Sequence, residues 1–179
     1  MPFSTPMMKQ YMSIKRENED ALLFFRMGDF YEMFYDDARI AAKVLGITLT
    51  SRSKGEKAVP MAGIPYHAAG AYIPKLIKAG YKVAVCEQLQ NGAEKNDSKA
   101  GTKGIVEREV VRVITPGTLT EDAMLDDKDN NYLLSLFLND DKFGLSWVDI
   151  STGKFMVQDV NKSSLLDELA RINPSECII

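Results

Sequence analysis

The chain has 179 residues, of which 45% are hydrophobic and 26% are charged, so it has ordinary globular composition and room for one large or two small domains. It contains no run of about 18 apolar residues, which excludes a membrane-spanning helix, and we expect no secretory signal, because the N-terminus lacks a basic and an apolar region. The net charge of −3 is unevenly divided. Residues 1–114 carry 17 Lys and Arg against 13 Asp and Glu, whereas residues 115–179 carry 5 against 12, which suggests two modules with different partners.

The first half alternates helical and strand patterns. Thr5-Pro6 predicts the start of a helix that fades near Asn18, with Thr5 as its cap. The further expected elements are a strand at 21–27, a helix at about 30–45, a short strand at 47–50, a basic loop at 51–57, an irregular segment at 59–65 whose two prolines exclude a central strand, a helix at about 67–79, a strand at 81–87, a mobile loop at 90–104 and a strand at 106–114. This alternation predicts a mixed α/β domain.

The junction between the strand at 21–27 and the following helical pattern is the most informative segment. Asp29 is a good N-cap, and Glu32 has the spacing of a capping box, so we expect Phe30 in the first helical turn at a strand-to-helix corner. A large aromatic side chain there is poorly placed to join a core and well placed to touch a partner. Spacing alone favours plainer interpretations, in which Phe30 packs on the neighbouring helix and Glu32 only caps it. Gly28 and Gly63 are expected at tight turns.

The second half predicts a smaller module. Thr115-Pro-Gly117 breaks the chain, and an acidic connector follows at 118–130. Strands at 131–138, 143–150 and 154–160, separated by turns, predict an antiparallel meander. Ser163 is expected to cap a helix that ends at Asn173-Pro174, before a strand that begins at 176. We therefore expect an incomplete domain here.

Several kinds of chemistry have no support in the sequence. It contains no phosphate-binding loop, no dinucleotide fingerprint and no nucleophile elbow. A zinc site is not expected, because His67 is the only histidine and no Cys-x-x-Cys occurs, and Cys86 and Cys177 are expected to be buried free thiols in a reducing cytoplasm. Asp149 is a candidate magnesium ligand in a nuclease-like module, although a solvent-facing aspartate before a turn is the preferred interpretation.

Five long motifs occur in a fixed order: TPMMKQY at 5–11, FRMGDFYEMFYDDA at 25–38, VPMAGIPYH at 59–67, VAVCEQ at 83–88 and VVRVITPGT at 110–118. Together they resemble the MutS family of bacterial DNA mismatch-repair proteins, from about Thr5 to the last residue. The resemblance implies a mixed-sheet α/β mismatch-recognition domain at 1–115, an acidic linker at 116–128, and the first part of an RNase H-like α/β connector domain at 129–179.

The resemblance also implies roles for individual residues. Phe30 is expected to enter DNA from the minor groove, stack on a mispaired base and kink the duplex, and Glu32 to hydrogen-bond that base. With the family match, we prefer these roles to the plainer ones. Further expected DNA contacts, each with ordinary packing or a solvated side chain as the alternative, are Met27, Arg52, Lys54, Lys57, Met61, His67 and Arg108.

No catalytic or metal-binding residue is expected in this chain. The ATP, the magnesium and the ATPase domain of the family belong to the full-length protein. The expected partners are duplex DNA with mismatches or small unpaired loops, a second copy of the protein and a MutL-type repair protein, in the bacterial cytoplasm at the nucleoid. The alternatives are a metal-dependent nuclease that uses Asp149 and a pure protein-interaction module.

Overall fold

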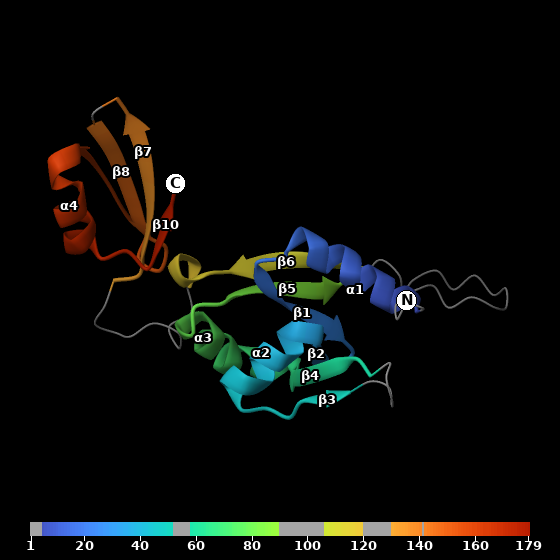
Figure 1. The fold of residues 1–179 in the computed structure, drawn as a ribbon. Coiled ribbons are helices and arrows are strands. Elements are labelled where there is room, and N and C mark those ends of the chain that lie inside the picture. The colour runs from blue at the N-terminus through green and yellow to red at the C-terminus, as the bar shows by residue number, and fades with distance from the viewer. Residues whose placement is uncertain (1–4, 52–57, 90–105, 120–129, 141) are drawn as a thin grey trace. The chain divides into compact units, whose positions relative to one another are not determined.

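The computed structural model describes residues 5–51, 58–89, 106–119, 130–140 and 142–179. The chain divides into two compact units, Met1–Val113 and Ile114–Ile179. Each unit combines helices with one mixed β-sheet, so the predicted mixed α/β class is confirmed (Figure 1). Within the described residues, no helix is long and apolar enough to cross a membrane.

The sheet of the first unit is built around the strand pair β1 and β2. Its spatial order is β3 (Thr50–Ser51), β4 (Pro60–Pro65), β2 (Phe30–Phe34), β1 (Ala21–Met27), β5 (Lys82–Gln88) and β6 (Arg108–Ile114). β2 pairs antiparallel with both β1 and β4, whereas β1 pairs parallel with β5. β5 and β6 run in opposite directions in Figure 1. β2 is therefore flanked by a partner strand on each side, β4 along its whole length and β1 along residues 30–32.

Helices cover this sheet. Helix α1 (Pro6–Glu17) places Met8 and Tyr11 against Leu23, Phe25 and Phe34, which share one face of the sheet. The alternate side chains of the strands are also fully buried, among them Phe24, Met33, Ile64 and Val83. Helices α2 (Tyr35–Leu45) and α3 (Ala69–Lys78) pack against each other, α2 also contacting β4 and α3 contacting β5. The centre of the sheet is thus covered on both faces.

Most elements predicted for the first unit are confirmed. The backbone N–H of Met8 donates to Thr5 Oγ1 at 3.3 Å, which is the expected cap of α1. The strands β1, β5 and β6 and the helix near 67–79 are present, the helix beginning with a 3-10 turn, η2 (Tyr66–Ala68). The short strand expected at 47–50 is displaced to Thr50–Ser51.

Two predictions for the first unit are wrong, and they concern adjoining strands. Residues 30–34 form strand β2 rather than the start of a helix, which begins only at Tyr35 with no side-chain cap. Residues 60–65 form a regular strand, because Pro60 and Pro65 occupy its two ends and leave the inner N–H groups free to pair. Gly63 consequently lies within a strand, not at a tight turn.

The second unit has a four-stranded sheet of order β10-β7-β8-β9. The expected antiparallel meander is confirmed as β7 (Tyr132–Asn139), β8 (Lys142–Asp149) and β9 (Lys154–Asn161), and β10 (Glu176–Ile178) adds parallel to β7. Helix α4 (Leu165–Ile172) packs on one face, over Leu134, Leu145 and Trp147. The cap predicted at Ser163 is wrong, since the 3-10 turn η6 (Lys162–Ser164) precedes α4.

The start of the expected linker packs on the second unit. Residues 116–118 form the 3-10 turn η4 (Pro116–Thr118), and the N–H of Gly117 donates to Glu176 Oε2 at 3.0 Å. The Asn131 side-chain amide donates to the carbonyl of Pro116 at 3.0 Å. These contacts join η4 to β10 and β7 of the same unit. Residues 120–128 of the linker, residues 52–57 of the basic loop, which include Arg52, Lys54 and Lys57, and the loop at 90–104 lie outside the described residues.

Two side chains differ from expectation in their burial. Asp149 is 2% exposed, so the solvent-facing prediction is wrong. Its Oδ1 accepts from the N–H of Ser151 at 3.0 Å, the Ser151 hydroxyl at 2.6 Å and the N–H of Thr152 at 3.3 Å, which closes the turn after β8. Cys86 is buried as predicted, and burial raises the pKa of its thiol to about 12, but Cys177 is exposed because β10 is an edge strand.

Candidate nucleic-acid interface

The β1–β2 hairpin ends in a tight turn that exposes Phe30. Gly28 has a φ of +60°, a conformation that glycine adopts without strain at the first position of a two-residue hairpin loop. Met27 pairs with Phe30 across this turn. The next strand also holds the turn, since Phe30 pairs with Pro65 and the N–H of Tyr66 donates to the Asp29 carbonyl at 2.9 Å. The Phe30 backbone is thus fixed from both sides, while its side chain is 44% exposed.

Glu32 lies on the same face of β2 as Phe30, two residues further along the strand. It pairs with Phe25 of β1 and with Gly63 of β4. Because no helix begins at Asp29, the interpretation of Glu32 as a capping carboxylate is wrong. The strand arrangement instead puts an exposed aromatic ring and a half-buried carboxylate side by side on one face.

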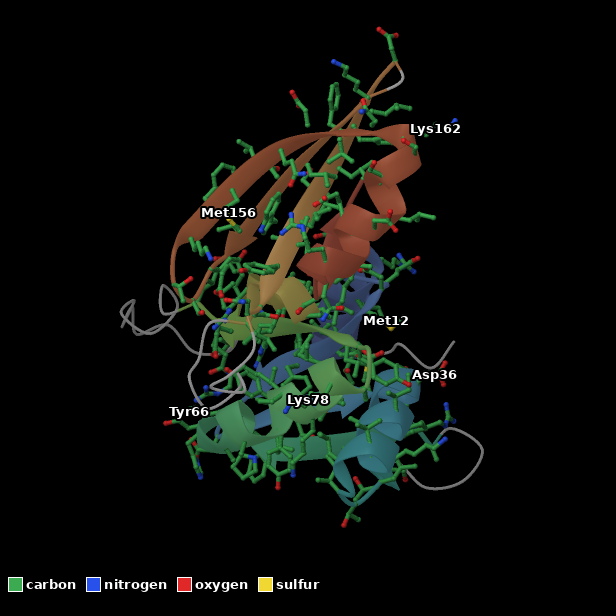
Figure 2. The ribbon with its side chains drawn as sticks, turned by 90° about the vertical axis from the view of Figure 1, so that its left-hand side faces the viewer. Met12, Asp36, Tyr66, Lys78, Met156 and Lys162 are labelled. Carbon is green, nitrogen blue, oxygen red and sulfur yellow. The ribbon has the colours of Figure 1, made fainter. Side chains whose placement is uncertain are left out.

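A layer of polar and aromatic contacts stabilises the base of the hairpin on its other face. The guanidinium carbon of Arg26 lies 3.6 Å from the ring centroid of Tyr66, and Arg26 Nε donates to the Gly28 carbonyl at 2.6 Å. Arg26 also pairs with Glu87, which accepts a hydrogen bond from the Tyr31 hydroxyl. Burial, and then Glu87, raise the pKa of Tyr31 to about 12, so this hydroxyl remains a donor. Figure 2 shows Tyr66 at the surface of the unit.

Sequence reasoning missed this supporting layer. Arg26, Tyr66 and Glu87 lie inside the motifs at 25–38, 59–67 and 83–88, but they are distant in sequence. The pairing of β1 with β5 brings Arg26 beside Glu87, and the pairing of β2 with both β1 and β4 brings Tyr66 to the same end of the sheet. The available signal was a charged residue within each of two apolar strand patterns, Arg26 in β1 and Glu87 in β5.

The structure gives Arg108 a clear internal role. Its Nε donates to the Arg26 carbonyl at 2.6 Å, and its Nη1 donates to the Val106 carbonyl at 2.9 Å and to Gln10 Oε1 at 3.1 Å. Its guanidinium carbon lies 4.9 Å from the Phe25 ring centroid, and burial lowers its pKa. Arg108 therefore joins β6, β1 and α1. A phosphate contact by Arg108 stays a prediction.

The other predicted contacts are spread over the same unit. Met27 and Met61 are half-buried and pack against the cluster under α1, as the plainer interpretation expected. His67 is exposed in η2, with its ring centroid 5.7 Å from that of Tyr66. Of these, only Met27 pairs directly with Phe30. The DNA contacts of all three remain predictions.

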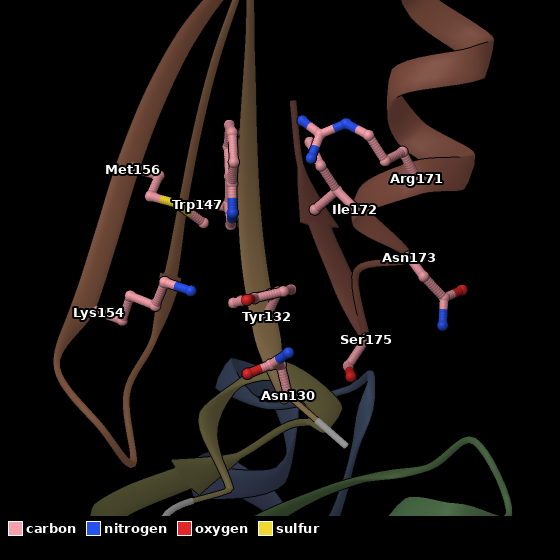
Figure 3. Close-up of a pocket in the computed structure, with 9 residues that line it drawn as sticks. All are labelled: Asn130, Tyr132, Trp147, Lys154, Met156, Arg171, Ile172, Asn173 and Ser175. Atoms are coloured by element: carbon pink, nitrogen blue, oxygen red, sulfur yellow. The ribbon is translucent and has the colours of Figure 1, made fainter. Parts of the chain in front are cut away.

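The second unit contains a pocket of about 640 Å³, beside Trp147 and Tyr132 (Figure 3). Lys154 and Arg171 extend toward these rings from β9 and α4 in Figure 3. Among the described residues that line it, none is a carboxylate, and nowhere in the described ranges do three or more His, Cys, Asp or Glu side chains gather to hold a metal. The nuclease alternative therefore lacks a ligand set in this part of the chain.

Comparison with known proteins matches both units to one family. The model of MutS domain I matches residues 5–123, and the model of MutS domain II matches residues 131–179. The chain belongs to the MutS family. It is 55% identical over 177 residues to the DNA mismatch repair protein MutS of Pelotomaculum thermopropionicum, and the aligned region covers 97% of this chain and 20% of that protein. It is 52% identical over 177 residues to the protein of the same name from Staphylococcus aureus, with 98% and 20% covered. The chain thus spans about a fifth of the length of these MutS relatives.

Proposed function

We propose that the first unit recognises mismatched DNA, with Phe30 as a wedge that enters from the minor groove and stacks on the mispaired base. The single observation that carries this proposal is the Phe30 ring, 44% exposed at the end of a hairpin whose backbone is fixed by two neighbouring strands. The relatives' name, DNA mismatch repair protein MutS, gives the biological context.

The physics of base stacking explains how such a wedge discriminates. Prising open a base step costs a few kcal/mol in paired DNA, and less where pairing is already poor. Stacking of an aromatic ring on a base returns about 1–3 kcal/mol and is indifferent to base identity. The kink that accompanies insertion is also cheaper at a weakly stacked step. One ring therefore senses many different mismatches and small unpaired loops through their deformability.

An inserted side chain can separate two base pairs only if the protein around it deforms less easily than the DNA. The stack of Arg26 on Tyr66, the Arg26 bond to the Gly28 carbonyl and the pairing of Phe30 with Pro65 all restrain the hairpin end. A cation–π contact of this kind contributes about 0.5–2 kcal/mol. We infer that this layer keeps the ring extended before DNA arrives, so that little binding energy is spent on ordering the loop.

Glu32 is proposed to accept a hydrogen bond from the displaced base. A carboxylate near phosphates is electrostatically unfavourable, and this repulsion weakens binding to correctly paired duplexes, where no base offers a compensating bond. Arg52, Lys54, Lys57, His67 and Arg108 are proposed to contact phosphates, which position the protein without reading sequence, and Met27 and Met61 to line the groove wall.

The wider organisation is also a proposal. We assign residues 1–115 to the mismatch-recognition domain, 116–128 to the linker and 129–179 to the start of an RNase H-like connector domain. A second copy and a MutL-type repair protein are the proposed protein partners, and ATP with magnesium is proposed to act in the full-length protein, in the cytoplasm.

The test compares mismatched and fully paired duplexes with the full-length protein and its Phe30→Ala variant. Loss of the stacking energy predicts a 5- to 150-fold fall, roughly, in affinity for the mismatch, leaving weak, salt-sensitive binding to any duplex. Phe155→Ala is the matched control, because Phe155 is 64% exposed in the second unit and has no proposed DNA contact. An unchanged mismatch preference in Phe30→Ala would refute the wedge.

A further inference from the structure

We propose that Gly63 is a positioning residue for Glu32: the missing side chain at position 63 leaves the space in which the Glu32 carboxylate lies. This inference rests on the proposed function, because it concerns how the base-binding carboxylate is held. Gly63 and Glu32 are directly opposite each other in the β2–β4 pair, so their side-chain positions share one face of the sheet.

The geometry leaves no room for a larger residue at position 63. A Cβ atom built on Gly63 would lie 2.5 Å from Glu32 Oε2, 2.9 Å from Cδ and 3.1 Å from Oε1. Carbon and oxygen atoms in ordinary contact are about 3.5 Å apart or more. Any side chain at position 63 would therefore displace the carboxylate.

The backbone offers no competing reason for a glycine here. Gly63 lies inside the regular strand β4 and is not among the glycines with positive φ, unlike Gly28. Alanine would be compatible with that conformation, and a glycine inside a strand weakens it. The close approach of the Glu32 carboxylate is therefore the physical reason that the structure supplies for glycine at this position.

The neighbour on the other side explains why the carboxylate leans this way. Glu32 is flanked on β1 by Phe25, whose ring is fully buried between the Tyr11 ring, at 5.4 Å, and the Arg108 guanidinium, at 4.9 Å. That side of Glu32 is filled, whereas the side toward β4 is open only because residue 63 has no side chain. The carboxylate is thereby kept over β4, on the face from which the Phe30 ring extends.

The displaced group is the end of a flexible side chain, so the fold can tolerate Gly63→Ala while the carboxylate moves. We expect the melting temperature of this variant to be unchanged or raised by about 2–4 °C. We expect the preference of the full-length protein for a mismatched duplex to fall about tenfold or more, as for loss of a charge-assisted hydrogen bond. Gly144→Ala is the matched control, because a Cβ there would meet only the Phe137 carbonyl at 3.9 Å.

The decisive measurement is a double-mutant cycle with Glu32→Ala, read out as mismatch preference. If Gly63 acts through Glu32, Gly63→Ala has no further effect once Glu32 is alanine. An equal effect of Gly63→Ala in both backgrounds overturns the inference, as does a large loss of stability, which would show that the carboxylate did not yield. Wild-type preference in Gly63→Ala, with preference lost in Phe30→Ala and Glu32→Ala, overturns this inference alone. Wild-type preference in Phe30→Ala and Glu32→Ala would overturn the proposed function with it.

Discussion

The buried carboxylate of Asp37 joins three elements of the first unit, and its removal is a severe test of how this fold is held. β2 pairs only with residues 25–27 of β1, so the earlier N–H of Leu23 lacks a strand partner on that side. It donates instead to Asp37 Oδ2 at 2.9 Å. Asp37 also accepts from the Tyr11 hydroxyl at 3.4 Å and pairs with Lys15 at 3.0 Å. Burial, together with Asp37, raises the pKa of Tyr11 far above its usual value, so Tyr11 stays a donor.

The magnitude follows from what Asp37→Ala leaves behind. Removing one partner of a buried ion pair costs about 3–5 kcal/mol, and the unsatisfied N–H of Leu23 is part of that penalty. The lower end of this range applies to Asp37→Ala, because the Lys15 side chain is 21% exposed and keeps a hydrogen bond to the Ala21 carbonyl at 2.6 Å. We therefore expect a loss of about 3 kcal/mol. Asp37→Asn keeps an acceptor for Leu23 and should cost about half as much.

Native-state hydrogen exchange of the β1 segment measures this loss directly. A destabilisation of about 3 kcal/mol speeds exchange through unfolding about 10²-fold. Asp36→Ala is the control, since Asp36 is adjacent but 84% exposed, and its pair with Arg39 at 2.6 Å contributes about 1 kcal/mol at most. Similar exchange rates in Asp37→Ala and Asp36→Ala would refute the structural role assigned to Asp37.

Three further predictions concern single side chains. Burial acts to raise the pKa of Asp149, but hydrogen bonds from the following turn outweigh it and hold the pKa below its ordinary value, so their stabilisation is present above about pH 4 and is lost as pH falls through the folded-state pKa. In urea unfolding followed by Trp147 fluorescence, the free energy of unfolding should therefore fall less on acidification in Asp149→Asn than in the wild type. An equal fall in the two proteins would contradict this. Thiol alkylation at pH 8 should modify the exposed Cys177 quickly and the buried Cys86 only on unfolding, whereas equal rates would refute that burial. Arg108→Ala should lower the free energy of unfolding of the first unit by about 2 kcal/mol. If Arg108 contacts a phosphate, the variant should also reduce by about one the slope of the logarithm of the DNA-binding constant against the logarithm of salt concentration, whereas an unchanged slope would assign Arg108 to the fold alone.

The sequence predicted most elements of the first unit but not the form of the hairpin. Asp29 and Glu32 have capping-box spacing, a local signal for a helix. The observed strand is decided instead by pairing with β1 and β4, the second of which begins about 30 residues later in the chain. Such long-range pairing overrides local propensity. The exposure expected for Phe30 is nevertheless found, for a different structural reason.

The sequence identified candidate residues of the site but not how those residues are arranged in space. Phe30 and Glu32 were singled out from a motif, but their shared face depends on strand periodicity, and the close approach of Glu32 to Gly63 depends on register. The burial of Asp149 has a similar origin, since its hydrogen bonds to the turn replace water. Cys177 lies in an apolar run, yet it is exposed because its strand is at the edge of the sheet.

The most direct test of the wedge is the bend angle of bound DNA, measured by energy transfer between dyes at the two ends of a short duplex with the full-length protein. Insertion of Phe30 predicts a sharp kink in the mismatched duplex that Phe30→Ala abolishes, with paired DNA remaining closer to straight in both proteins. A mismatched duplex bent to the same angle by Phe30→Ala as by the wild type would contradict it.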